Sequence, residues 1–188
     1  MNEISLLRLA RGNDVLAGSS AGRRMCNSLW DIAKASKSGL FIADCSGVSV
    51  ATSSFLREGI VAFRNLVRRE KSDLYPVLSN LTADVEEEFV ALLNQMGEAF
   101  WVFDVGRGIV KKHRLIGRID SKLKETLDLI EEGKGYDAAT LWKSTNSTES
   151  VGVTAWNNRL ANLSKQGLVF ESKVGKQKYF HPLHECRG

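Results

Sequence analysis

The sequence predicts an α/β part with a mixed or mostly parallel sheet, followed by a smaller α+β part. Over residues 1–117, short apolar runs alternate with amphipathic stretches in the order strand, helix, strand, helix, strand, helix, strand. This alternation is typical of parallel strands joined by right-handed crossover helices. Over residues 118–188, three helical stretches precede two short strands. We therefore predict two domains, 1–117 and 118–188.

The strands of the first domain are predicted from apolar runs and from alternation. Residues 4–9 alternate as a half-buried strand, whereas residues 40–44 and 99–103 are continuous apolar runs, as in strands buried on both faces. Residues 75–78 are typical of another strand, and residues 109–116 return as an edge strand after a turn at 106–108. Apolar residues at helical spacing predict the helices at about residues 19–37, 55–70 and 82–97.

The net charge of +4 is unevenly distributed along the chain. Residues 1–105 carry 11 Lys and Arg against 13 Asp and Glu, whereas residues 106–188 carry 15 against 9. This basic excess favours a polyanionic partner for the C-terminal part. A surface of mixed lysines is also common on proteins that bind no polyanion, so the charge alone does not decide.

Three features bear on the cellular compartment. No apolar run approaches the roughly 20 residues that cross a bilayer, and the first residues lack the pattern of a secretory signal. Cys26, Cys45 and Cys186 lie far apart and form no CxxC pair, which favours reduced thiols. We therefore expect a cytoplasmic protein with no membrane partner.

Residues 39–58 read GLFIADCSGVSVATSSFLRE: a buried strand ends in Asp44, and a Ser-rich helix start follows. This arrangement resembles STAS and STAS-like domains, and the resemblance covers about residues 1–116. In the related anti-sigma-factor antagonists, a serine at this helix start is phosphorylated by a kinase with a histidine-kinase-type ATPase fold. The resemblance therefore implies Ser53 or Ser54 as a candidate phosphorylation switch, and such an ATPase or another protein as a candidate partner.

This sequence departs from the antagonist pattern at two positions of the helix start. Thr52 stands where the antagonists have Asp, and Phe55 stands where they have Gly. A phosphate at a helix N-terminus would be held by free amides and by the helix dipole. The alternative is that Thr52 or Ser53 simply caps the helix.

The C-terminal part is predicted to contain helices at about residues 120–132, 138–144 and 151–166, then strands at 168–172 and 177–183. The stretch WNNRLANLSKQGLVFESKVGKQKYFHPL resembles prokaryotic winged helix-turn-helix regulators. In that family the third helix reads the major groove and the hairpin wing touches the DNA backbone or minor groove. The resemblance therefore implies double-stranded DNA as a partner.

Helical geometry divides the third helix into two faces. Val153, Trp156, Leu160 and Leu163 form an apolar stripe and are expected in the core, as is Trp142 of the preceding helix. The opposite face carries the candidate DNA contacts Thr154, Ala155, Asn158 and Asn162, with Arg159 at its border. The hairpin adds three lysines suited to phosphates: Lys173, Lys176 and Lys178.

The sequence predicts neither metal binding nor catalysis. His181, His184 and Cys186 are potential metal ligands, but no fourth ligand follows at a recognised spacing. No nucleophile, base and orienting group occur at a recognised spacing either. We predict no metal site, no cofactor and no catalytic residue, and we do not expect an enzyme.

The leading hypothesis is a cytoplasmic transcriptional regulator. Its winged helix would bind duplex DNA, and its STAS-like domain would mediate homodimerisation, sensing or partner binding. The alternative is a phospho-switched protein-interaction adaptor of the anti-sigma-factor-antagonist type, which would not bind DNA. A third class is a small-molecule sensor, for which the sequence shows no pocket pattern.

Overall fold

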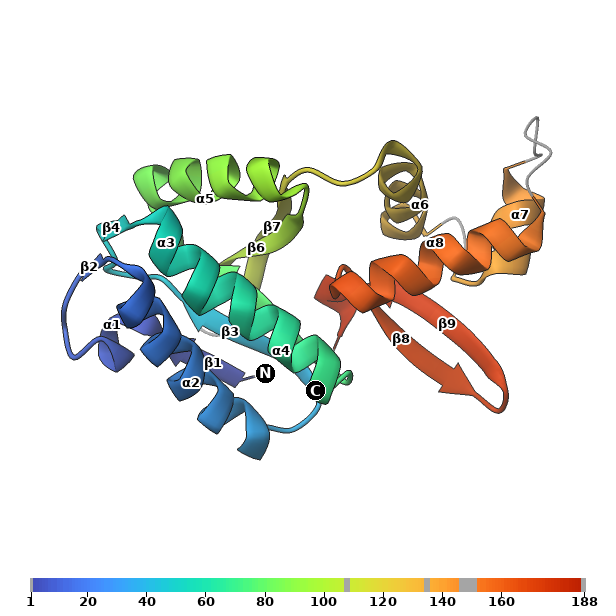
Figure 1. Cartoon of the computed structure of the whole chain (residues 1–188). Coiled ribbons are helices and arrows are strands. Elements are labelled where there is room, and N and C mark those ends of the chain that lie inside the picture. Colours follow the sequence, from blue (N-terminus) through green and yellow to red (C-terminus); the bar gives the residue numbers. More distant parts are fainter. Residues whose placement is uncertain (1, 107–108, 134–135, 146–151, 187–188) are drawn as a thin grey trace. The chain divides into compact units, whose positions relative to one another are not determined.

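The computed structural model describes residues 2–106, 109–133, 136–145 and 152–186, and these form two compact units (Figure 1). The first unit extends to Arg118, and the second spans Ile119–Cys186. The structure confirms a mixed α/β protein with a mostly parallel sheet and a C-terminal helical part that ends in a hairpin. The predicted turn at 106–108 and the predicted helix start at 151 lie partly or wholly outside the described residues.

A five-stranded sheet organises the first unit, in the order β1-β3-β5-β6-β7. Its strands are β1 (Asn2–Ser5), β3 (Gly39–Asp44), β5 (Leu74–Ser79), β6 (Ala99–Gly106) and β7 (Ile109–Gly117). The first four are mutually parallel, and β7 pairs antiparallel with β6, as expected for an edge strand. A second, minimal sheet pairs β2 (Val15–Leu16) with β4 (Val50–Ala51).

Helices connect the parallel strands and bury one face of the sheet. They are α1 (Leu6–Leu9), α2 (Ser19–Ala35), α3 (Ser53–Phe55), α4 (Ala62–Glu70) and α5 (Ala83–Met96), with a π-helical segment, η1 (Leu56–Val61), between α3 and α4. Alternate strand residues such as Phe41, Ala43 and Phe100 share one core with Leu29 of α2 and Phe63 of α4. This alternation is the period-two pattern of a strand.

The predicted strand at residues 4–9 is wrong in its second half. The strand β1 ends at Ser5, whose hydroxyl accepts a hydrogen bond from the backbone N–H of Arg8 at 3.3 Å. This bond caps the short helix α1, in which Leu6 is the buried residue. A capping side chain therefore overrides the local alternation.

Two glycines bring α2 and η1 into close contact. A Cβ atom on Gly22 would lie 2.8 Å from the backbone oxygen of Phe55, and a Cβ on Gly59 would lie 3.3 Å from the Cα of Gly22. No other residue fits at Gly22 without a backbone shift. The π-helical widening at η1 coincides with this crossing.

The second unit contains three helices and a hairpin. These are α6 (Ser121–Glu131), α7 (Ala138–Ser144), α8 (Val153–Gln166), β8 (Val169–Val174) and β9 (Gln177–Pro182), followed by the 3₁₀ turn η2 (Leu183–Glu185). Asp120 and Asp137 cap α6 and α7, and Gly167 ends α8 with a φ of 74°. The backbone N–H of Phe180 in β9 donates to the oxygen of Tyr136 at 2.7 Å, which ties the segment before α7 to the hairpin.

One expected core residue of the second unit lies at the surface. Trp142 is 39% exposed, so the prediction that it belongs to the core is wrong, and Ala138 and Leu141 are the buried residues of α7.

Among the helices of the described chain, none is both long and apolar enough to cross a bilayer.

Candidate functional site

The helix α8 has one buried face and one polar, exposed face. Trp156, Leu160 and Leu163 are buried, as predicted. Thr154, Asn158 and Asn162 are exposed and lie four residues apart, so they form one stripe along the helix. Ala155 is half-buried beside this stripe. The exposed face also includes Lys165, as helical geometry predicts, and Asn157, which was not among the predicted residues of this face.

Arg159, which the sequence places among the candidate DNA contacts, is buried. It is only 8% exposed, and its guanidinium lies 4.8 Å from the centre of the Trp156 ring. A carboxylate oxygen of Glu125 in α6 lies 3.8 Å from the guanidinium. Arg159 therefore holds α8 against α6. Its border position on the helical wheel could not distinguish this role from a contact to DNA.

Asn162 is partly engaged within the helix itself. The side-chain amide of Gln166 donates a hydrogen bond to Oδ1 of Asn162 at 2.9 Å. Asn158 and Thr154 lie one and two turns closer to the N-terminus of α8. They are therefore better placed than Asn162 to reach a base edge if this end of the helix enters a groove.

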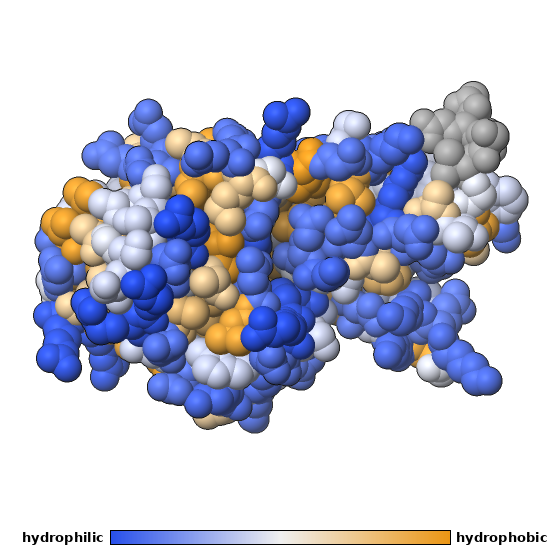
Figure 2. All heavy atoms as spheres, viewed as in Figure 1, coloured by the Kyte–Doolittle hydropathy of each residue, from blue (hydrophilic) through white to orange (hydrophobic). Residues whose placement is uncertain are grey.

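The three predicted hairpin lysines are exposed and close together. Lys173 and Lys178 are directly opposite each other in the β8–β9 register, and Lys176 lies in the turn between the strands. Figure 2 shows the hairpin, at the lower right, as mostly hydrophilic surface. Such a cluster of lysines at a strand turn is suited to bind phosphates.

A carboxylate moderates the charge of these lysines. Nζ of Lys178 lies 2.9 Å from Glu171 Oε1, and Nζ of Lys173 lies 4.0 Å from the same atom. Lys176 has no carboxylate partner within the described part of the chain. Lys176 is therefore the hairpin lysine with the fewest competing interactions.

The base of the hairpin is fixed by a stack of rings. His181 lies between Tyr136 and Phe170, with ring centroids 4.8 and 4.7 Å away, and its Nε2 lies 2.9 Å from the hydroxyl of Ser172. Burial lowers the pKa of His181, although the nearby Glu185 opposes this. The neutral imidazole is thus the form that the fold favours, and the hairpin is firmly held at its base.

The charge of the second unit is polarised along its sequence. Residues 119–151 carry four Lys and Arg against seven Asp and Glu, whereas residues 152–186 carry five against two. The unit as a whole is therefore neutral, and the basic excess of the C-terminal half includes five Lys and Arg in residues 106–118. The positive charge of this unit is concentrated on α8 and the hairpin.

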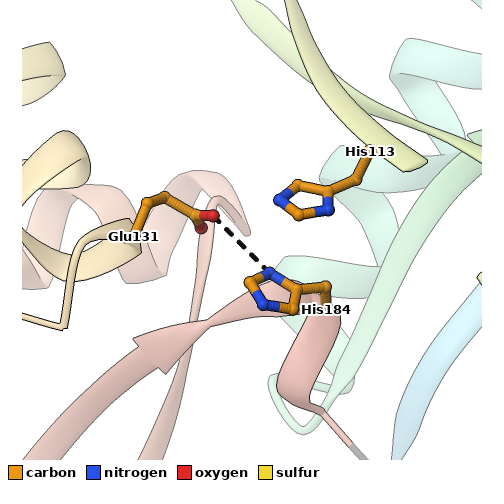
Figure 3. A group of neighbouring side chains, drawn as sticks. All are labelled: His113, Glu131 and His184. Atoms are coloured by element: carbon orange, nitrogen blue, oxygen red, sulfur yellow. Dashed lines mark ion pairs between the residues drawn. The ribbon is translucent and has the colours of Figure 1, made fainter. Parts of the chain in front are cut away.

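The histidines near the C-terminus have different surroundings. His181 belongs to the ring stack, whereas Nδ1 of His184 lies 3.5 Å from Oε2 of Glu131 (Figure 3). In the first unit, His113 of β7 packs near the rings of Trp101 and Phe103, with centroids 5.4 and 6.0 Å away.

The structure pairs none of the three cysteines, all of which it describes, in a disulfide. Cys26 and Cys45 are buried, and Cys186 is half-buried. Burial raises the pKa values of Cys26 and Cys45, so neither thiol is activated as a nucleophile at neutral pH.

The two candidate phosphorylation residues lie in the first unit, at the start of α3. Thr52 caps this helix, because its hydroxyl accepts from the backbone N–H of Phe55 at 3.4 Å. The backbone N–H of Ser53 donates to Glu88 Oε1 at 2.9 Å, and its hydroxyl donates to the same oxygen. Ser54 shares a hydrogen bond with Thr52 at 3.2 Å.

The carboxylate of Glu88 in α5 therefore lies at this helix N-terminus, where a phosphate group would otherwise be held. The hydrogen bonds from Ser53 lower the pKa of Glu88, which keeps the carboxylate charged. A phosphate on Ser53 would face this carboxylate and would be repelled by it. The sequence did not indicate this pair, because Glu88 lies in another helix.

Asp44 organises the carboxyl edge of the sheet. Its Oδ1 accepts hydrogen bonds from Ser46 and Asn80 at 2.8 Å and from Ser79 at 3.2 Å. Asn80 has a left-handed φ of 54°, and its Oδ1 accepts from the backbone N–H of Val105 at 3.1 Å. These bonds join the chain after β3 and β5 to β6, so Asp44 has a structural role here.

Comparisons with protein-family models, with curated proteins and with solved structures find no match to this chain. The functional proposal consequently depends on the geometry of the two units themselves.

Proposed function

We propose that this protein is a DNA-binding transcriptional regulator whose second unit is a winged helix. In this proposal α8 enters the major groove and the β8–β9 hairpin binds phosphates. The observation that carries the proposal is the pairing, within one unit, of a polar exposed face on α8 with a lysine-bearing hairpin.

The dimensions of α8 suit a major groove. The helix has 14 residues and ends at Gly167. An α-helix is about 10–12 Å in diameter, and the major groove of B-DNA is about 12 Å wide. Asparagine can donate to and accept from an adenine edge, so Asn158 is the residue expected to read sequence, with Thr154 beside it.

The hairpin supplies affinity in this proposal rather than sequence choice. Lys173, Lys176 and Lys178 would neutralise phosphates and release counterions, an effect that does not depend on base sequence. Arg159 has no part in the interface, because it is buried against Trp156.

The first unit has a supporting role in this proposal. We interpret its mostly parallel sheet as a STAS-like domain that mediates homodimerisation, sensing or partner binding. Paired half-sites about one helical turn of DNA apart would be the expected operator for such a dimer. We propose no catalysis, and we propose a cytoplasmic location.

A selection experiment tests this function. The full chain would be incubated with a library of random duplexes, and the bound duplexes would be sequenced. We expect an enriched motif for the parent protein and a relaxed preference at one or two positions for Asn158→Ala. Lys122→Ala, an exposed lysine on α6, is the matched control and should leave the motif unchanged. Binding without any enrichment, or no binding at low salt, would contradict the proposal.

The phospho-switched adaptor remains the competing function. It requires a phosphate on Ser53 or Ser54 and no affinity for DNA. The hydrogen bonds between Ser53 and Glu88 weigh against it, because the site is already filled by a carboxylate. Phosphate found by mass spectrometry on either serine, in protein that fails the duplex selection, would favour the adaptor.

A further inference from the structure

A groove in the first unit lies between the chain that follows α1 and one face of α2, which are neighbours in Figure 1. Its volume is about 830 Å³, within the range of small-molecule sites. Four residues of α2 that recur at the spacing of one helix face line it: Ala21, Arg24, Met25 and Ser28. The opposite wall is formed by Leu9, at the end of α1, and by six residues of the segment that follows it: Ala10, Arg11, Asn13, Val15, Leu16 and Ala17.

The floor of the groove is apolar. Leu16, Met25 and Phe55 contribute to the lining, and they are 4%, 6% and 1% exposed. They come from β2, α2 and α3, so the floor is part of the packed core and is preformed. Such a floor would bind an apolar body of a ligand by removing its surface from water.

Two arginines line the groove, and no carboxylate does. Arg11 and Arg24 are both exposed, and neither has a carboxylate partner in the parts of the chain that the structure describes. The neighbouring Arg23 differs from them, because its guanidinium lies 3.6 Å from a carboxylate oxygen of Glu58. The groove therefore presents uncompensated positive charge next to an apolar floor.

The backbone of Arg11 is held in an unfavourable conformation. Its φ of 56° lies in the left-handed region, which costs a residue with a Cβ and costs glycine little. The position follows α1, where a left-handed residue ends the helix and glycine is the usual choice. An arginine is present where a glycine would be more stable, and such strain is concentrated at functional sites.

We infer that this groove binds a small organic acid with an apolar body and one anionic head group. The body would lie on Leu16, Met25 and Phe55, and the carboxylate, sulfonate or phosphate head would pair with Arg11 and Arg24. This site is independent of the DNA interface proposed for the second unit. It would make the first unit a ligand sensor, whatever the second unit binds.

A fluorescent organic acid tests the inference directly. The full chain would be titrated with 8-anilinonaphthalene-1-sulfonate, which fluoresces when its aromatic body leaves water. Decanoate and decanol would then be compared as competitors, because they share an apolar chain and differ in charge. We expect decanoate to displace the dye at least tenfold more effectively than decanol. Equal displacement by the two, or no saturable binding of the dye, would overturn the inference.

Variants separate the role of each groove residue. Arg24→Gln and Arg11→Gly should each weaken decanoate binding about tenfold or more, because each removes a charge-assisted contact. Ser28→Trp should obstruct the groove and reduce binding of both dye and competitor. Arg8→Gln is the matched control, since Arg8 is an exposed arginine on α1 outside the groove, and it should bind like the parent.

The stability of Arg11→Gly distinguishes loss of a ligand contact from loss of structure. Glycine accepts the left-handed φ without strain, so the thermal midpoint should be unchanged or raised while binding is lost. Weakened binding accompanied by a lower thermal midpoint in both arginine variants, or equal weakening in Arg8→Gln, would contradict a specific site.

Discussion

At the residue scale, Arg159 shows how burial decides between two functions for one side chain. The guanidinium packs on Trp156 and faces Glu125, and the residue is almost fully buried. We predict that Arg159→Ala lowers the free energy of unfolding by about 1–2 kcal/mol, through lost packing and a lost cation–π contact. Urea unfolding measures this change.

The same variant also tests the assignment of the interface. Arg159→Ala should retain the duplex motif of the parent at temperatures where it remains folded. A variant of unchanged stability that selects a different motif would mean that Arg159 contacts bases.

His181 gives the hairpin a dependence on pH. Burial lowers its pKa in the folded protein below the value of about 6.5 in an unfolded chain. Between these two values the unfolded chain binds a proton that the native protein does not, so stability falls as the pH falls below about 6.5. We predict that the difference in unfolding free energy between the parent and His181→Gln is largest near neutral pH and shrinks as the pH is lowered through this window.

Urea unfolding of both proteins from pH 7.5 to 5 measures this dependence. Groups that the two proteins share cancel in the comparison. A difference that grows at low pH would show that the charged imidazole is the form favoured by the fold.

At the scale of elements, the crossing of α2 and η1 depends on Gly22. A Cβ at this position would meet the backbone oxygen of Phe55, which cannot move as a side-chain end could. We predict that Gly22→Ala destabilises the first unit by about 1–3 kcal/mol, the usual cost of overpacking. Thermal unfolding provides the measurement, with Gly152→Ala as the control because no atom lies within 4 Å of its Cβ position. Equal midpoints for the two variants would show that the helices separate without cost.

A glutamate of the hairpin partly neutralises the charge of its lysines. Glu171 lies within ion-pair distance of Lys178 and Lys173, so part of the lysine charge is neutralised before any ligand arrives. We predict that Glu171→Gln binds duplex DNA several-fold more tightly at low salt, because both lysines become available to phosphates. Fluorescence anisotropy with a labelled duplex measures the affinity. Weaker binding in this variant would mean that Glu171 positions the lysines productively.

The elements that were predicted correctly from the sequence are those determined by local periodicity. The buried strand at Gly39–Asp44 and the helix that ends at Gly167 depend on residues within one segment. The core assignment of Trp142 was wrong because contacts between segments decide which face of α7 is buried, and that face carries Ala138 and Leu141. The hydrogen bonds of Ser53 to a glutamate of a different helix also depend on such contacts. A single sequence contains no direct signal for such contacts.

At the scale of the whole molecule, two compact units combine different surface chemistry. The second unit is neutral overall and concentrates its positive charge on α8 and the hairpin. The first unit ends with β7, whose segment holds much of the basic excess that the sequence attributed to the C-terminal half. Because the first unit extends to Arg118, the basic residues of 106–118 belong to the first unit and not to the second.

The candidate contacts on α8 could be chosen from helical geometry, whereas the groove beside Arg11 and Arg24 could not, because its walls come from separate segments.

The most direct test of the DNA-binding proposal is the salt dependence of binding to a duplex of random sequence. The affinity of the full chain would be measured across a range of salt concentrations for the parent, for Lys176→Ala and for the control Lys122→Ala. We expect the logarithm of affinity to fall linearly with the logarithm of salt concentration, with a slope smaller by about one for Lys176→Ala and unchanged for Lys122→Ala. No binding by the parent at low salt, or the same slope for all three proteins, would contradict the proposed interface.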